Sequence, residues 1–309
     1  MKKKLSIVVP IYQNELNLEV TIPSLLSLEK IIGSIDLELI FVDDGSTDRS
    51  YKILKDFHLK NKERIKIIKF SKNYGQTPAI QAGLRKATGD CIGIISADLQ
   101  EPYLMFADMY KLWLEGNRFI IAERTKRKEN FIHQFLSNLY WGMIRKIAIK
   151  NFPKGGYDFC LMDRQVQQSV NECYEKNTSI FPLIFSMGYE PFFLYYTREL
   201  RAAGKSQWTF QKKAKIFIDT VIAFSYFPIR FISYTGISVS IFSMFMAIFY
   251  IYNYFYLDNR YPGWTSIIVL IFFFGGLILV TLGLIGEYLW RILDEVRKRP
   301  NYIIEEVVG

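Results

Sequence analysis

Two oxygen-bearing side chains, Asp98 and Gln100, follow a short apolar segment with one residue between them. They belong to the run SADLQEP at residues 96–102. In an extended chain, side chains at this spacing point the same way, so both could face one cation. Carboxylate and amide oxygens are hard ligands that suit Mg²⁺ or Mn²⁺ better than zinc. The run therefore predicts a divalent-metal site that could also hold a diphosphate. The alternative is a helix-capping role for the acid before Pro102.

Polar residues also follow two earlier apolar segments. Residues 42–48 read VDDGSTD, and a carboxylate here can accept hydrogen bonds from a nucleobase or a ribose. We assign this role to Asp44, and the alternative is that Asp43 or Asp48 only caps the next helix. Residues 9–15 read VPIYQNE, where a turn at the proline and a nearby aromatic ring could receive a nucleotide.

Short apolar segments rich in Val and Ile alternate with stretches of helical periodicity. The predicted strands are Leu5–Val9, Leu37–Val42, Ile65–Phe70, Cys91–Ile95 and Phe119–Ala122. The predicted helices are Glu15–Lys30, Asp48–Lys60, Pro78–Ala87 and Pro102–Glu115, with further helices at residues 130–150 and 210–230. This alternation is typical of βαβ units in a mostly parallel sheet. Such sheets bind ligands at the carboxyl ends of their strands, where the polar runs fall.

Two long segments without charged side chains lie near the C-terminus, Phe231–Leu257 and Thr265–Gly286. Each is longer than the roughly 20 residues that cross a bilayer. The short linker between them predicts a transmembrane hairpin. Basic residues flank its outer ends (Arg230, Arg291, Arg297, Lys298 and Arg299), whereas the linker has only Arg260. The positive-inside rule therefore predicts that the rest of the chain is cytoplasmic. A helical hairpin buried in a soluble core is the alternative.

Composition narrows the class of protein. A chain of 309 residues that is 50% hydrophobic is not disordered. The cysteines, Cys91, Cys160 and Cys173, form no CxxC pair, which argues against a disulfide framework or a thiolate zinc site. The net charge of +9 suits nucleic acid, anionic lipid or phosphorylated substrates. Because the basic residues are dispersed and lie close to the apolar segments, we expect no nucleic-acid partner. His58 and His133 are expected to be surface residues without a catalytic role.

The runs VVPIYQNE, FVDDGSTD, NYGQ and SADLQEP together resemble the family 2 glycosyltransferases. GGYDF at residues 155–159, RELRAAGKS at 198–206, the two apolar segments and RPNYI at 299–303 further resemble the polyprenyl-phosphate branch of that family. That branch includes dolichyl-phosphate mannose synthase and bacterial undecaprenyl-phosphate glycosyltransferases. The resemblance implies an α/β fold, namely a GT-A domain with a Rossmann-like, mostly parallel sheet, followed by a two-helix transmembrane hairpin.

The resemblance also implies four regions along the chain. These are a cytoplasmic catalytic domain (residues 1–208), juxtamembrane amphipathic helices (209–230), two transmembrane helices (231–290) and a cytoplasmic tail (291–309). The implied reaction is inverting transfer of a sugar from a nucleotide sugar to polyprenyl (undecaprenyl) phosphate, for modification of cell-envelope glycans. It would take place at the cytoplasmic face of the inner (plasma) membrane with Mg²⁺ or Mn²⁺, and we expect a homo-oligomer.

Site residues follow from the same resemblance, position by position. The nucleotide sugar is expected to contact Pro10, Tyr12, Asn14, Val42, Asp44, Ala97, Asp98 and Arg124. The metal is expected at Asp98 and Gln100, and the acceptor phosphate at Arg201, Lys205, Ser206 and Gln207. The implied catalytic residues are Asp158, Asp98 and Arg201.

The chain departs from the family pattern at several positions. Ser96 stands where relatives often have the first acid of an Asp-x-Asp motif, and Cys160 and Gln207 replace basic residues. These changes leave a non-catalytic, membrane-anchored scaffold that binds sugar nucleotides as an alternative. A polysaccharide synthase of the same family, another alternative, would show a Gln-x-x-Arg-Trp motif and more spans, and this sequence has neither. A transporter needs a polar path, which two spans without charges do not provide.

Overall fold

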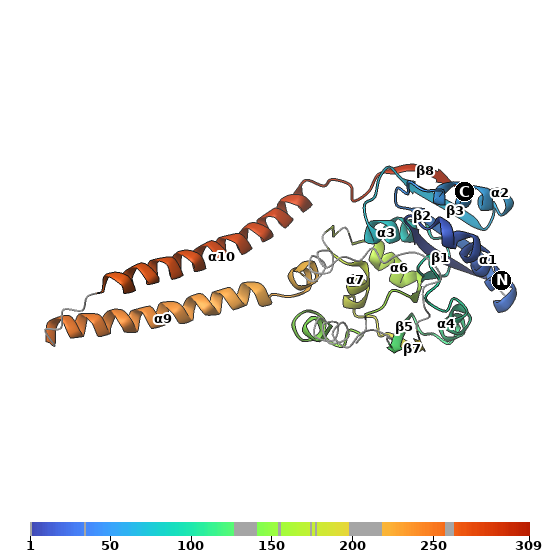
Figure 1. Ribbon diagram of the computed structural model, residues 1–309. Coiled ribbons are helices and arrows are strands. Elements are labelled where there is room, and N and C mark those ends of the chain that lie inside the picture. The colour runs from blue at the N-terminus through green and yellow to red at the C-terminus, as the bar shows by residue number, and fades with distance from the viewer. Residues whose placement is uncertain are drawn as a thin grey trace. The chain divides into compact units, whose positions relative to one another are not determined.

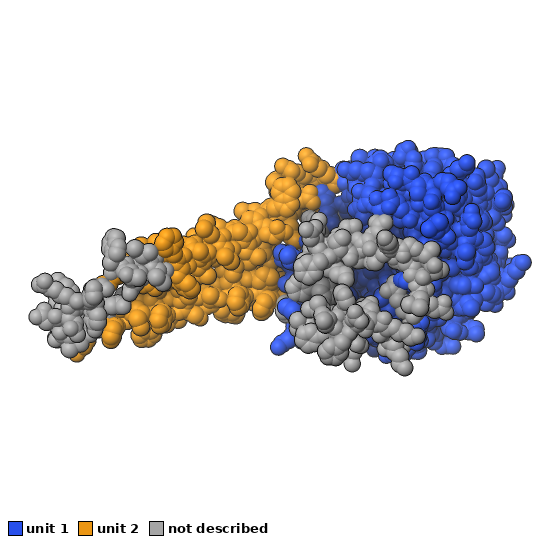
Figure 2. Space-filling model, viewed as in Figure 1, with its two compact units in different colours: residues 1–223, 300–309 blue, residues 224–299 orange. Residues whose placement is uncertain are grey.

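The structure is a computed structural model that describes residues 2–33, 35–126, 141–153, 156–173, 175–176, 178–197, 218–256 and 263–309. The chain forms two compact units (Figure 2). Unit 1 comprises Met1–Ala223 together with Pro300–Gly309, and unit 2 comprises Phe224–Arg299. The N-terminal part and the last residues of the chain therefore fold together.

Unit 1 is built on a mixed sheet with the strand order β7-β5-β6-β4-β1-β2-β3-β8 (Figure 1). The strands are β1 (Lys3–Ile11), β2 (Ile35–Asp43), β3 (Ile65–Phe70), β4 (Cys91–Ile94), β5 (Phe119–Lys126), β6 (Cys160–Asp163), β7 (Phe192–Thr197) and β8 (Ile304–Val308). Strands β1 to β4 are parallel, as predicted, and β5 is parallel to β7. Strand β6 runs antiparallel between β4 and β5.

Helices follow the first four strands, also as predicted. Those of unit 1 are α1 (Glu15–Ile32), α2 (Ser50–Lys60), α3 (Gln76–Lys86), α4 (Met105–Leu114), α6 (Arg164–Asn171) and α7 (Ile180–Ser186), with a π-helical turn at Ile144–Ala148. Apolar residues of α1 and α4 pack on the sheet, where Leu18, Phe41, Phe106 and Phe159 are fully buried. Parallel strands covered in this way read as continuous apolar runs, which is why the sequence showed them.

Two of the predicted helices are only partly described. Of residues 130–150, the structure describes 141–150, which contain the π-helical turn. Of residues 210–230, it describes 218 onward, where residues 218–224 are helical and residues 225–226 interrupt the helix. The prediction of one continuous helix to Arg230 is therefore wrong. A new helix begins at Phe227, and Pro228 fits its first turn, where the missing N–H of proline costs nothing.

The end of the chain adds the edge strand β8, which sequence analysis treated as part of a tail. Strand β8 pairs antiparallel with β3, with Val308 opposite Ile67 and Ile304 opposite Phe70. An exposed strand edge offers unpaired backbone groups to other chains, and β8 covers that edge of β3.

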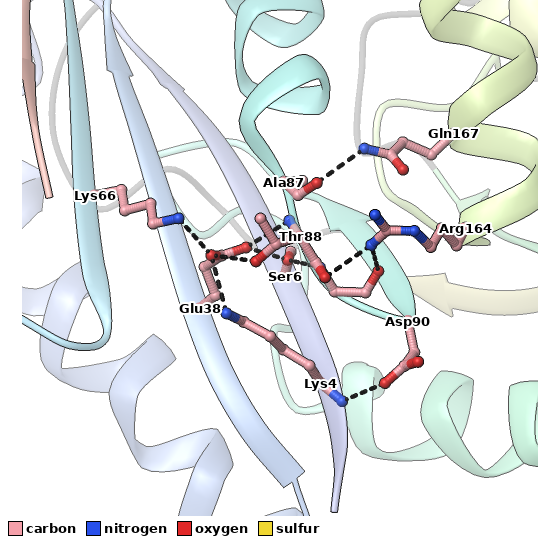
Figure 3. Close-up of polar contacts among 10 residues, drawn as sticks. Lys4, Ser6, Glu38, Lys66, Ala87, Thr88, Asp90, Arg164 and Gln167 are labelled. Carbon is pink, nitrogen blue, oxygen red and sulfur yellow. Dashed lines mark hydrogen bonds and ion pairs between the residues drawn. The ribbon is translucent and has the colours of Figure 1, made fainter.

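A buried carboxylate, Glu38, fixes the amino ends of the central strands (Figure 3). It accepts hydrogen bonds from the Ser6 hydroxyl and from the amide and hydroxyl of Thr88, and ion pairs join it to Lys4 at 3.2 Å and Lys66 at 2.9 Å. Burial alone would raise the pKa of this carboxyl, but the hydrogen bonds from Ser6, Thr88 and Lys66 lower it from 4.5 to about 2. Glu38 therefore stays charged and ties β1, β2, β3 and the turn before β4 together.

Unit 2 consists of two helices, α9 (Phe227–Tyr256) and α10 (Trp264–Val296). Windows at Phe227–Met246 and Leu270–Val296 are long and apolar enough to cross a membrane, and neither window is buried. Large apolar side chains such as Phe272 and Leu279 are 76% and 71% exposed. The alternative of a hairpin buried in a soluble core is therefore not supported. Helix α10 also extends past the predicted span and carries a Glu287–Arg291 ion pair.

Candidate active site

The predicted nucleotide-binding residues gather at the carboxyl ends of three neighbouring parallel strands. In the sheet, Pro10 pairs with Val42, and Val8 pairs with Ile94. The amide of Asp44 donates to the carbonyl of Ile11 at 2.8 Å, so the chains leaving β1 and β2 stay together. The loops after β1, β2 and β4 therefore share one edge of the sheet, where α/β proteins bind ligands.

The loop after β1 is held in an uncommon conformation. The Gln13 amide donates to the Ser46 hydroxyl at 3.0 Å, and the Asn14 amide donates to the Ser50 hydroxyl at 2.9 Å. Gln13 has a φ of 51°, in the left-handed region that non-glycine residues rarely adopt. Such backbone strain concentrates at functional sites. The ring of Tyr12 is half-buried at this position.

The three acids after β2 have different roles. Asp48 accepts hydrogen bonds from the Glu15 amide at 3.2 Å and from the Ser50 amide at 3.0 Å, so it binds the first amide of both α1 and α2. Asp43 is fully buried and accepts from the Ser46 amide at 3.3 Å, and burial raises its pKa. The alternative that Asp43 or Asp48 only caps the next helix stays a prediction, although both acids bind backbone amides near the start of α2.

Asp44 holds the loop between β3 and α3. Its carboxylate accepts hydrogen bonds from the amides of Tyr74 at 2.6 Å and Gly75 at 2.8 Å. Burial raises the pKa of Asp44 from 3.8 to about 6, although the two amide donors oppose that shift. Asp44, with its pKa raised to about 6, therefore holds the loop between β3 and α3 through two backbone amides.

Asp98 and Gln100 lie in a turn, so the extended geometry expected from the sequence is wrong. Leu99 between them has a φ of 47°, and Asp98 Oδ1 accepts from the Gln100 amide at 3.5 Å. The preceding carbonyl, of Ala97, accepts a hydrogen bond of 2.7 Å from the Thr21 hydroxyl of α1. The loop is thus anchored to α1, and alternation along a strand does not set the directions of its side chains.

The donor atoms of this loop fit a hard divalent cation. Across the described ranges, no group of three or more His, Cys, Asp and Glu side chains is placed to hold a metal. Mg²⁺ and Mn²⁺ favour oxygen ligands, and Mg²⁺ commonly takes one or two protein carboxylates and fills its other positions with water and substrate phosphates. Asp98 and Gln100 carry oxygens of this kind, so the residues fit such an ion, and the metal site itself stays a prediction.

Two predicted site residues from different segments form an ion pair. Arg124 Nη2 donates to Asp158 Oδ2 at 2.9 Å, with the arginine on β5 and the aspartate just before β6. Their side chains are 10% and 24% exposed. Burial opposes the charge on Arg124, but the carboxylate of Asp158 and the nearby Tyr196 and Glu101 raise its pKa. The other oxygen of Asp158, Oδ1, is buried and has no hydrogen-bond partner in the described part of the chain.

Sequence reasoning missed two residues of this cluster, Glu101 and Tyr196. Glu101 is fully buried and Tyr196 is 6% exposed, and both act on the charge of Arg124. Glu101 lies in the SADLQEP run, and an acid this close to the end of a predicted strand was the signal that could have identified it. Tyr196 lies on β7 in an aromatic run that reads as core. Only the pairing of β7 with β5, which places Tyr196 opposite Arg124, brings it to the site.

The residues predicted to bind the acceptor phosphate lie outside the described residues: Arg201, Lys205, Ser206 and Gln207. His133 also lies outside them. The expectation that His58 is a surface residue is wrong. Its side chain is buried, with Nδ1 2.7 Å from the carbonyl of Ile65. It fills the gap between α2 and β3, which a polar helical sequence did not reveal.

The loops at the carboxyl ends of β1, β2 and β4, the oxygen-bearing side chains of Asp98 and Gln100, and the Arg124–Asp158 ion pair make up the candidate site on a mixed α/β sheet. The sequence pattern described as glycosyl transferase family 2 matches residues 6–174, and the chain belongs to this family. It is therefore a glycosyltransferase with a GT-A-like fold, and the expected family is confirmed.

Relatives match over nearly the full length. An uncharacterized glycosyltransferase of Bacillus subtilis (strain 168) is 36% identical over 98% of this chain and 94% of its own length. A bactoprenol glucosyl transferase of Shigella phage SfII is 28% identical over 98% of both chains. Among solved structures, a glucosyl-3-phosphoglycerate synthase from Mycobacterium tuberculosis has a TM-score of 0.49 and 15% identity, covering 72% of this chain and 78% of that chain.

Proposed function

We propose that this glycosyltransferase moves a sugar from a nucleotide sugar to a polyprenyl phosphate, with inversion, at the cytoplasmic face of the plasma membrane. The observation that carries the proposal is the near full-length similarity to bactoprenol glucosyl transferases, including the region of two exposed apolar helices. Bactoprenol is a polyprenyl lipid, so an enzyme acting on it must work at a bilayer surface. The apolar hairpin provides the anchor that such an enzyme needs.

Chain connectivity supports the proposed topology. Helix α9 begins directly after unit 1, and the chain returns from α10 to unit 1 to form β8. Both ends of the hairpin therefore continue into the same folded unit. If the two helices cross a bilayer, their outer ends must lie on the side of that unit. This argument is independent of the positive-inside rule, which adds that the side of unit 1 is the cytoplasmic one.

The chemistry follows from the charges at the site. The bond from the anomeric carbon to the donor diphosphate breaks, and its electron pair leaves with the nucleoside diphosphate. A phosphate oxygen of the acceptor forms the new bond on the opposite face, which inverts the anomeric centre. This oxygen is already anionic at neutral pH, so Asp158 orients the reactants and stabilises positive charge more than it removes a proton.

Each group at the site has a distinct task. A divalent ion held at Asp98 and Gln100 would supply charge for the departing diphosphate. Arg124 keeps Asp158 ionised and fixed, which gives the preorganisation that such a transfer needs. Tyr12, Asn14 and Asp44 would hold the nucleotide. The acceptor phosphate would meet Arg201, Lys205, Ser206 and Gln207, which remains a prediction, as does a homo-oligomeric state.

A transfer assay with defined lipids tests the proposal. Purified full-length protein, Mn²⁺ or Mg²⁺ and a panel of labelled UDP- and GDP-sugars are incubated with undecaprenyl phosphate, and lipid products are extracted. We expect one sugar to appear on the lipid phosphate and none on undecaprenol, which lacks the phosphate. Donor binding without lipid product would favour the scaffold alternative. A polymeric product would favour a polysaccharide synthase.

A further inference from the structure

The C-terminal segment of the chain contacts the loop that Asp44 holds. Just before β8, the carbonyl of Ile303 accepts a hydrogen bond of 3.1 Å from the amide of Ser71. Ser71 is the first residue after β3 and opens the β3–α3 loop, residues 71–75. Figure 1 shows β8 beside β3 at this side of unit 1. The segment that follows α10 thus reaches the base of the loop at the predicted donor site.

Three aromatic rings continue this contact into the loop. The ring of Tyr302 stacks on Phe70, with centroids 4.9 Å apart and planes inclined by 13°. Phe70 is buried and meets Tyr74 edge-on, at 5.8 Å and 89°. Arg85 donates from Nη1 to the Tyr302 hydroxyl at 3.3 Å, which fixes the outer ring. Tyr302, Phe70 and Tyr74 therefore form a row from the C-terminal segment to the β3–α3 loop.

The loop end of this row is the residue that binds Asp44. The amides of Tyr74 and Gly75 both donate to the Asp44 carboxylate. Gly45, the next residue, has a φ of 68°, and a Cβ there would clash with the carbonyl carbon of Lys72. The backbone of the loop therefore lies directly on the Asp44 turn. A displaced Tyr74 ring would move the amides that orient the carboxylate.

We propose that Tyr302 is a positioning residue for donor binding, acting through Phe70 and Tyr74 on the amides that hold Asp44. This inference rests on the proposed function, in which Asp44 lies against the nucleotide. Other contacts of β8 are made elsewhere: Glu306 binds Lys55 at 2.8 Å, and Glu305 binds Lys69 at 2.9 Å. These contacts keep β8 paired when the Tyr302 ring is removed, so the effect on the loop can be separated from loss of the strand.

The test compares Tyr302→Ala with Tyr302→Phe, which keeps the ring and loses only the hydroxyl. Val307→Ala is the matched control, because it trims a β8 side chain that lies opposite Ile68 and away from the loop. Full-length proteins in detergent are titrated with UDP-glucose and with GDP-mannose, each with Mn²⁺. Hydrogen exchange of amides in residues 71–75 is measured without any nucleotide.

We expect Tyr302→Ala to exchange faster at the loop amides and to bind the donor about fivefold more weakly, the scale on which one aromatic pair contributes. Val307→Ala should match the wild type, and Tyr302→Phe, which keeps the stacking on Phe70 but loses the hydrogen bond from Arg85, should change both readouts less than Tyr302→Ala. Unchanged loop exchange in Tyr302→Ala, or equal weakening in Val307→Ala, would overturn the inference. If the wild type binds neither nucleotide sugar, the proposed function fails at the donor step, and the exchange data still decide whether Tyr302 orders the loop.

Discussion

Arg124 on β5 forms an ion pair with Asp158, which lies two residues before the antiparallel strand β6. The 2.9 Å ion pair links β5 to the segment before β6, and the amide of Ala122 donates to the carbonyl of Phe159 at 3.0 Å next to it. The mainly buried guanidinium leaves one carboxylate oxygen of Asp158 without a hydrogen-bond partner among the described residues. An oriented, ionised carboxylate with an unused oxygen is suited to act on a reacting centre.

The Asp158→Asn variant tests this role. The amide keeps the size and one acceptor of the carboxylate but loses its charge. We expect the turnover number to fall by about 100-fold, the scale of removing one electrostatic group from an active site, with donor affinity nearly unchanged. Steady-state kinetics with saturating donor measures this. A turnover number within threefold of the wild type would exclude Asp158 from the reaction centre.

Asp98→Ala tests the metal assignment. We expect loss of turnover and a large increase in the Mn²⁺ concentration for half-maximal donor binding, because the substitution removes the only carboxylate among the proposed ligands. Asp36→Ala is the control, since Asp36 is exposed at the amino end of β2, opposite to the site. In Mn²⁺ titrations, Asp98→Ala should need much more metal for half-maximal donor binding, whereas Asp36→Ala should need as much as the wild type. An Asp98→Ala protein with normal metal dependence would contradict the assignment.

The raised pKa of Asp44 predicts that donor binding depends on pH. Its pKa is raised from 3.8 to about 6 by burial, with neighbouring Asp43 adding to the shift and the Tyr74 and Gly75 amides opposing it. Below about pH 6 the carboxyl becomes protonated and its hydrogen bonds from the loop weaken. We therefore expect donor affinity to fall between pH 7 and 5. In Asp44→Asn the affinity at pH 7.5 should be lower, and its fall between pH 7 and 5 should be smaller than that of the wild type.

The stability effect of the same group has the opposite sign. Because the folded state binds the Asp44 proton more tightly than the unfolded state, the contribution of Asp44 to the free energy of unfolding decreases as the pH rises from about 4 to 6. Unfolding measured over this range should show Asp44→Asn gaining stability relative to the wild type as the pH increases. A constant difference would contradict the raised pKa.

The sequence predicted those features that depend on local patterns. Strand β3 begins and ends where its apolar run does, and α1 to α4 follow their strands, because buried parallel strands and helices with an apolar face leave clear signals. Asp44 and Asp98 were found because polar residues interrupt apolar runs at strand ends. The turn at Leu99 was not predictable, since a left-handed conformation of leucine has no sequence signature.

Features that depend on distant pairing were missed. The strand β8 lies in a short segment after a long helix, and only its place beside β3 makes it part of the sheet. Tyr196 and Glu101 reach Arg124 through the strand order β7-β5-β6-β4, which no local pattern encodes. The burial of His58 likewise results from packing of α2 on β3. Non-local contacts decide these details, and a single sequence does not contain them explicitly.

The lowered pKa of Glu38 predicts that unit 1 loses stability in acid. Its pKa is lowered from 4.5 to about 2 by hydrogen bonds that outweigh burial, so its stabilising contribution is complete above about pH 4.5 and is lost as the pH falls toward 2. The size of that contribution is about 3 kcal/mol. Glu38→Gln should lower the melting temperature at pH 7, and the difference from wild type should shrink in acid. Exposed Glu63→Gln serves as the control and should behave like the wild type.

A lysine placed in α10 separates a membrane span from an exposed helix in water. Leu279 is 71% exposed and lies within the apolar window Leu270–Val296. Inside a bilayer, a lysine near the centre of a span costs about 3 kcal/mol, whereas on a helix in water it costs almost nothing. We therefore expect Leu279→Lys to reduce the amount of protein that remains in carbonate-washed membranes. Leu59→Lys, at an exposed position of α2 in unit 1, should have no such effect. Recovery of the wild type in the soluble fraction without detergent would contradict the membrane span. Membrane retention of Leu279→Lys equal to that of the wild type would also contradict it, because a charged side chain is far less stable in hydrocarbon than in water.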